Sequence, residues 1–105
     1  ISGSGPAYVF YFLEAMEQAA VEMGLSAEHG RTLAQATFAG ASALASQSQE
    51  PLSVLRERVT SKGGTTYAAL TQMESDGVRQ AIVRALHAAA KRGTELGDEF
   101  GREED

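Results

Sequence analysis

Val59-Thr60-Ser61-Lys62-Gly63-Gly64-Thr65-Thr66 is a segment rich in glycine and hydroxyl residues, and it lies between two stretches whose apolar residues recur with helical spacing. The paired glycines allow positive φ angles and let a ligand approach the main chain closely. Because a helix is expected to begin near Thr66, its first backbone N–H groups should point outward, where they suit a carboxylate or a phosphate. The alternative is that Gly63 ends one helix and Thr65 or Thr66 caps the next, with no ligand involved.

The sequence on both sides of this segment predicts helices. Apolar residues recur at three- and four-residue steps, and no segment alternates with period two. We expect five helices, at about residues 5–23, 27–46, 51–59, 66–74 and 78–100. Pro6 favours the first helix start and Gly24 the first helix end, while Ser26 and Asp76 are expected to cap the second and the last helix. The predicted fold class is therefore all-α.

Two packing expectations follow from the same pattern. Gly40 lies inside the second helix, where glycine costs about 1 kcal/mol against alanine, so close packing against a neighbour is expected there. Leu52, Leu55 and Val59 are expected to face inward from the third helix.

The last predicted helix carries a long apolar stripe that a single short chain cannot cover. Its members share three- and four-residue spacing and are Val78, Ile82, Ala85, Leu86, Ala89, Gly93, Leu96 and Phe100. A second copy of the chain could cover this stripe, which predicts an intertwined helical homodimer.

Composition excludes several classes of protein and site. The net charge is −5 without a basic stripe, which is unlike a nucleic-acid-binding domain. The chain has no cysteine, which excludes disulfides and thiolate metal sites and is compatible with a reducing compartment. No signal peptide and no membrane-spanning apolar run is present, so we expect a cytoplasmic protein without a membrane partner. One domain over residues 1–105 is expected, and the start at Ile1 without methionine suggests a piece of a longer protein.

The sequence offers only weak candidates for metal ligands and for the catalytic base of a nucleophile. His29 and His87 stand apart from carboxylates at ligand spacing, so no metal site is expected. Gly3-Ser4-Gly5-Pro6-Ala7-Tyr8 superficially resembles a dinucleotide fingerprint, but Tyr8 replaces the third glycine and no strand precedes it. What remains is a glycine-serine helix start, which is either simply capped or a second set of backbone donors facing a ligand. Together with the Val59–Thr66 segment it could hold a small anion.

These two segments, Ser2-Gly3-Ser4-Gly5-Pro6-Ala7-Tyr8 and Thr60-Ser61-Lys62-Gly63-Gly64-Thr65-Thr66, closely resemble in order and separation the C-terminal domain of pyrroline-5-carboxylate reductases. The resemblance covers essentially all 105 residues. It implies a helical dimerisation domain of the 6-phosphogluconate-dehydrogenase-like C-terminal type, following an N-terminal Rossmann domain that is absent from this chain. Enzymes of this family reduce 1-pyrroline-5-carboxylate to L-proline with NADPH or NADH, the last step of proline biosynthesis, and form homodimers or larger rings.

The resemblance also implies the residues of a site. Substrate binding is carried over to Ser61, Gly63, Gly64, Thr65 and Thr66, with the N–H groups of Gly64 and Thr65 as carboxylate donors. The hydroxyl near the ring nitrogen, and hence the catalytic role, is carried over to Thr66. The residues facing the cofactor are Ser4, Gly5 and Pro6. The family loop commonly has proline where this chain has Lys62, which removes a φ constraint from the loop.

Two other functions compete with this one. The chain could be a non-catalytic helical oligomerisation module whose glycine-threonine loops are only helix caps. It could also be the helical domain of a β-hydroxyacid-type dehydrogenase, but such enzymes use a lysine on a helix as the acid. Lys62, on a glycine-rich loop, is a poor match for that role.

Overall fold

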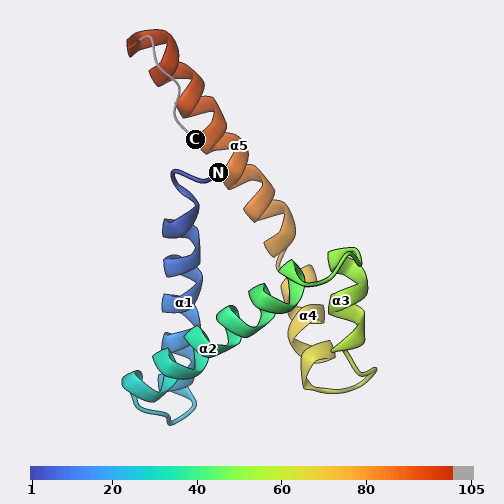
Figure 1. The fold of residues 1–105 in the computed structure, drawn as a ribbon. Coiled ribbons are helices and arrows are strands. Elements are labelled where there is room, and N and C mark those ends of the chain that lie inside the picture. The colour runs from blue at the N-terminus through green and yellow to red at the C-terminus, as the bar shows by residue number, and fades with distance from the viewer. Residues whose placement is uncertain (101–105) are drawn as a thin grey trace. The chain divides into compact units, whose positions relative to one another are not determined.

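The computed structural model describes the backbone of residues 1–100 and the side chains of residues 1–98. The described chain consists of five helices without a strand, as the sequence predicted (Figure 1). They are α1 (Gly5–Glu22), α2 (Ala27–Ser46), α3 (Leu52–Arg58), α4 (Thr65–Ser75) and α5 (Val78–Phe100). The Phe100 side chain, the last member of the predicted apolar stripe, lies outside the described side chains.

The link between α1 and α2 follows the two signals read from the sequence. Gly24 has φ +103°. Its N–H donates to the carbonyl of Val21 at 3.0 Å, while the Leu25 N–H donates to the carbonyl of Ala20 at 3.0 Å. This pair of bonds is a Schellman motif, which needs the left-handed backbone that glycine adopts without strain. The Ser26 hydroxyl then accepts the His29 N–H at 3.1 Å and caps α2.

The link between α4 and α5 corrects the predicted role of Asp76. Asp76 is the C-cap of α4, and its carboxylate accepts both hydrogen bonds of the Gln72 side-chain amide, at 3.1 and 3.2 Å. Gly77 has φ +69° and its carbonyl accepts the Ala81 N–H at 3.0 Å, so Gly77 is the residue that starts α5. The helix begins at Val78, as expected, but the residue directly before it is Gly77, whose positive φ makes the turn between the two helices, and not Asp76.

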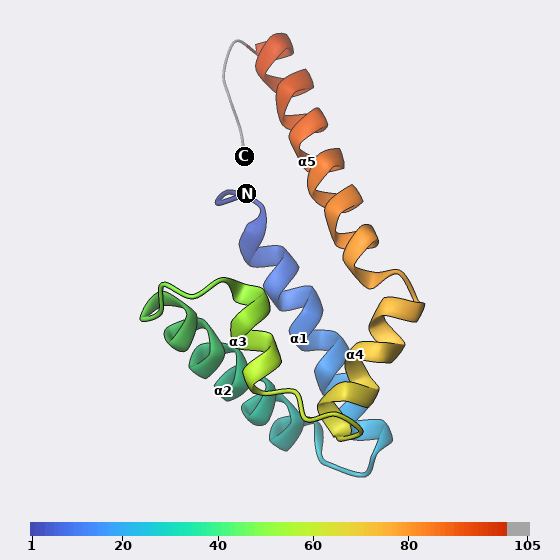
Figure 2. The same ribbon diagram turned by 90° about the vertical axis from the view of Figure 1, so that its right-hand side faces the viewer.

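The chain divides into two units, Pro6–Leu55 and Ile1–Gly5 with the residues from Arg56 onward. In the first unit α2 crosses α1 (Figures 1 and 2) through a seam of small residues. Ala20 is 8% exposed and Ala34 is 3% exposed, and Gly30 is buried between the two helices. A Cβ atom on Gly30 would lie 2.7 Å from the Ala20 Cβ. Glycine is therefore required at residue 30 because the helix backbones approach so closely.

The expected close packing at Gly40 is not found within the described residues, since a Cβ atom there would meet nothing within 4 Å. The aromatic rings of Phe12 and Phe38 add an edge-to-face contact between α1 and α2, with centroids 5.4 Å apart.

In the second unit, α4 and α5 pack against each other. Gly93 is buried on α5, and Leu86 and Leu96 are half-buried, in keeping with the predicted stripe. Ile82, however, is 48% exposed. Arg79 Nη2 lies 2.9 Å from Glu74 Oε1 and links the two helices on the surface.

Among the side chains that the structure describes, none larger than alanine is buried. Leu52 is 72% exposed and Val59 67% exposed, so the expectation that these two face inward from α3 is wrong for a single chain, while Leu55 is half-buried. The large apolar side chains that are most exposed lie on several helices and connections: Ile1, Phe10, Tyr11, Met23, Leu44, Leu52 and Val59. None of the described helices is both long enough and apolar enough to cross a bilayer.

Candidate functional site

The loop between α3 and α4 is built around a tight turn. The Gly64 N–H donates to the carbonyl of Ser61 at 3.0 Å, and Gly63 between them has φ +79°. A four-residue turn with positive φ at its third residue follows the type II pattern, which demands glycine at that position. Lys62 occupies the second position of the turn, where proline is also favoured.

The end of α3 fixes where this turn begins. The Thr60 N–H donates to the carbonyl of Glu57 at 3.1 Å, and the Thr60 hydroxyl donates to the carbonyl of Arg56 at 2.6 Å. These bonds occupy two carbonyls in the last turn of α3, so the chain leaves the helix in a defined direction. Ser61 and Lys62 follow as exposed residues.

The sequence allowed a start of α4 that is capped by Thr65 or Thr66, and the structure shows a different start. Gly64 is the N-cap, with φ −88° and ψ −174°, and no side chain caps the helix. Thr65 and Thr66 are the first two residues of the helix. The expectation of a threonine cap is therefore wrong, and with it the main reason for treating this loop only as a capping structure.

The backbone donors at this helix start divide into used and available groups. The Gly64 N–H is already bonded to Ser61, so the expectation that it is a free donor is wrong. The N–H groups of Thr65 and Thr66 have no acceptor within the described part of the chain. Both residues are exposed, and their N–H groups lie at the positive end of the helix dipole.

The charges along this segment favour an anion. The sequence contains no acidic residue between Glu57 and Glu74, and Lys62 lies within the loop itself. Arg56 and Arg58 lie in the last turn of α3. A chain with a net charge of −5 thus has a locally basic stretch just before the α4 start.

The first predicted segment also forms a helix start. The Gly5 N–H donates to the carbonyl of Ile1 at 2.6 Å, and Ser4 and Gly5 are half-buried. Because α1 begins at Gly5, Pro6 is its second residue, still within the turn where its missing N–H costs no hydrogen bond. That this segment and the α4 start line one cleft stays a prediction.

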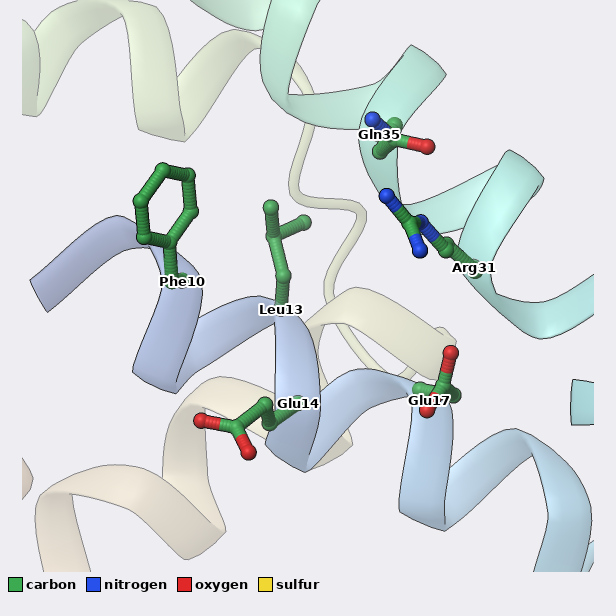
Figure 3. Close-up of a pocket in the computed structure, with 6 residues that line it drawn as sticks. All are labelled: Phe10, Leu13, Glu14, Glu17, Arg31 and Gln35. Atoms are coloured by element: carbon green, nitrogen blue, oxygen red, sulfur yellow. The ribbon is translucent and has the colours of Figure 1, made fainter. Parts of the chain in front are cut away.

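The Pro6–Leu55 unit has a pocket between α1 and α2 (Figure 3). It has a volume of about 280 Å³ and is lined from α1 by Phe10, Leu13, Glu14 and Glu17, and from α2 by Arg31 and Gln35. No predicted site residue lines it. In the part of the chain that is described, no three histidine, aspartate or glutamate residues gather as metal ligands.

Comparisons with known proteins give the chain its family. Residues 1–96 match the family model described as pyrroline-5-carboxylate reductase dimerisation. The chain is 41% identical over 100 residues to pyrroline-5-carboxylate reductase 2 of Bacillus subtilis, covering 95% of this chain and 36% of that protein. It is 40% identical over 102 residues to the Pseudomonas aeruginosa pyrroline-5-carboxylate reductase, covering 97% of this chain and 37% of that protein.

Solved structures agree with the sequence comparison. The Plasmodium falciparum pyrroline carboxylate reductase with NADP bound matches with a TM-score of 0.89 and 33% identity, covering 92% of this chain and 37% of that one. The Coxiella burnetii pyrroline-5-carboxylate reductase matches with a TM-score of 0.86 and 42% identity, over 91% of this chain and 36% of that one. The chain thus spans little more than a third of the length of these relatives. With both its sequence and its five helices matched, this chain belongs to the pyrroline-5-carboxylate reductase dimerisation family.

Proposed function

We propose that this chain is the dimerisation and substrate-binding domain of an enzyme that reduces 1-pyrroline-5-carboxylate to L-proline with NADPH or NADH. The observation that carries the proposal is the start of α4, where the N–H groups of Thr65 and Thr66 have no acceptor among the described residues. These donors would hold the substrate carboxylate, helped by the Ser61 hydroxyl. Gly63 and Gly64 would form the turn that keeps the loop close to the substrate.

The chemistry divides between the two ends of the substrate. The nicotinamide supplies the hydride when bound, and the protein supplies orientation and electrostatics. The carboxylate would be fixed at the α4 start, while the Thr66 hydroxyl would accept a hydrogen bond from the protonated ring nitrogen. A protonated C=N carbon is more electrophilic, and a hydroxyl stabilises it without adding a charge. Ser4, Gly5 and Pro6 would face the nicotinamide, whose other contacts would come from an N-terminal Rossmann domain.

The test of this assignment is Thr66→Val in the full-length reductase that carries this domain. A lost hydrogen bond to a charged group should lower kcat/KM about 10- to 100-fold. The Thr66 hydroxyl makes no hydrogen bond within the described residues, so the melting temperature should not change. Thr71→Val is the matched control, since Thr71 is also exposed on α4. Equal kinetics for the two variants would remove Thr66 from the site.

We also propose that a second copy of this chain covers the exposed apolar side chains. Phe10 is 63% exposed and Tyr11 76% exposed on α1, a helix that is apolar on most of its circumference. A helix of that kind is stable only when it is covered on several sides. Sedimentation of the isolated domain should give a dimer at micromolar concentration, and a folded monomer there would contradict the proposal.

We place the enzyme in the cytoplasm, in keeping with a sequence that lacks cysteine.

A further inference from the structure

We propose that Lys62 is an electrostatic positioning residue that attracts the substrate carboxylate to the start of α4. This inference rests on the proposed function, because it concerns the same loop and the same carboxylate. It adds a residue to which the family resemblance assigns no role, since the family loop commonly has proline at this position.

The turn explains the glycine in the loop but not the lysine. Gly63 is required by its φ of +79°, and the bond from Gly64 to Ser61 closes the turn. The second position of such a turn accepts most residues and favours proline. A lysine there contributes nothing to the turn that a neutral residue could not contribute, so its charge is the property that needs an explanation.

The surroundings leave that charge available. Lys62 is exposed and makes no ion pair within the described residues. No acidic residue occurs between Glu57 and Glu74, so the sequence near the loop offers no neutralising carboxylate. Lys62 lies three residues before Thr65, whose N–H has no acceptor in the same part of the structure. The charge and the two backbone donors therefore lie within one short segment of the chain, residues 62–66.

The expected effect is modest and depends on salt. Two exposed unit charges of opposite sign that lie about 7 Å apart in water attract each other enough to change a binding constant about three-fold. Salt at about 1 M shortens the screening length to about 3 Å, which should remove most of this effect. The attraction acts on the bound substrate and on the transition state alike, so it should change KM and leave kcat unaltered.

The experiment compares Lys62→Gln, Lys62→Pro and Lys62→Arg in the full-length reductase at about 20 mM and about 1 M salt. Gln and Pro remove the charge, and Pro also suits the turn. Both should raise the KM for 1-pyrroline-5-carboxylate about three-fold at low salt, with kcat unchanged and the difference lost at high salt. Arg should behave as the parent enzyme. Lys91→Gln is the control for net charge, because Lys91 is the other lysine of the chain and lies exposed on α5.

The outcomes separate this inference from the function on which it rests. If Gln and Pro leave KM and its salt dependence unaltered while the enzyme reduces the substrate, the role of Lys62 is overturned and the proposed function stands. The same holds if Lys91→Gln raises KM as much as Lys62→Gln. If Lys62→Pro disturbs folding or kcat, the KM of Lys62→Gln and its salt dependence decide whether the charge of Lys62 has this role. If the parent enzyme does not reduce 1-pyrroline-5-carboxylate, the proposed function fails, and this inference fails with it.

Discussion

Gly30→Ala tests the seam where α2 crosses α1, because two opposing effects have to be weighed there. Alanine in a helix is favoured over glycine by about 1 kcal/mol. Against this, the new Cβ would lie 2.7 Å from the Ala20 Cβ and 3.5 Å from the Glu17 carbonyl oxygen. A Cβ atom cannot rotate away from a clash, so the helices must separate by about 1 Å, and overpacking of this kind costs about 1–3 kcal/mol. We expect a net loss of about 1 kcal/mol.

The assay is thermal unfolding followed by circular dichroism at one fixed protein concentration, since the chain has no tryptophan for fluorescence. A loss of 1 kcal/mol should lower the melting temperature by about 4–8 °C. Gly40→Ala is the control in the same helix, because its Cβ would meet nothing within 4 Å among the described residues, and it should gain up to about 1 kcal/mol.

A double-mutant cycle makes the test sharper. Ala20→Gly removes the methyl group with which the new side chain collides, so Gly30→Ala in that background should stabilise the protein instead of destabilising it. The explanation would be refuted if Gly30→Ala stabilised the parent as much as Gly40→Ala does, or if its effect were the same in both backgrounds.

Substitutions at three further positions test the helix ends and a surface ion pair. Ser26→Ala removes the acceptor of the His29 N–H and should cost about 1 kcal/mol in urea unfolding, whereas Ser26→Gly should cost only a few tenths. Gly24→Ala forces a side chain into a backbone with φ +103° and should cost about 1–2 kcal/mol by the same measurement; an unchanged midpoint would mean that the turn has rearranged. Arg79→Ala breaks the ion pair with Glu74, but both side chains are more than half exposed, so the loss should stay below about 1 kcal/mol and shrink as salt is added.

The helices were predictable from the sequence because their ends carry strong local signals. Ser26 and Gly24 act through their own side chain or backbone, so each could be recognised from its neighbours along the chain. Asp76 was misassigned because two consecutive residues could each start α5, and the positive φ of Gly77 decided between them. Gly30 was missed for a different reason. Its role depends on Ala20, which lies on another helix, and only the crossing of the two helices shows that contact.

The location of the loop and of the α4 start was predictable from the sequence, and their hydrogen bonds were less so. Glycines and hydroxyls at a helix start indicated available backbone donors, and the α4 start has them at Thr65 and Thr66. Gly64 was expected to donate to a ligand, but the turn directs its N–H to Ser61. The turn type depends on φ at Gly63, and a pair of glycines in sequence permits several turns. The pocket between α1 and α2 was not foreseen, because its residues are brought together only by the crossing of the two helices.

A chain whose described side chains bury nothing larger than alanine has little of its own to offset the entropy lost on ordering. For such a chain, folding and association with a second copy should occur together, in one bimolecular step. Its melting temperature should then rise with protein concentration, and dilution should produce unfolded chains instead of folded monomers. Cellular abundance would in that way set how much of it is folded at all.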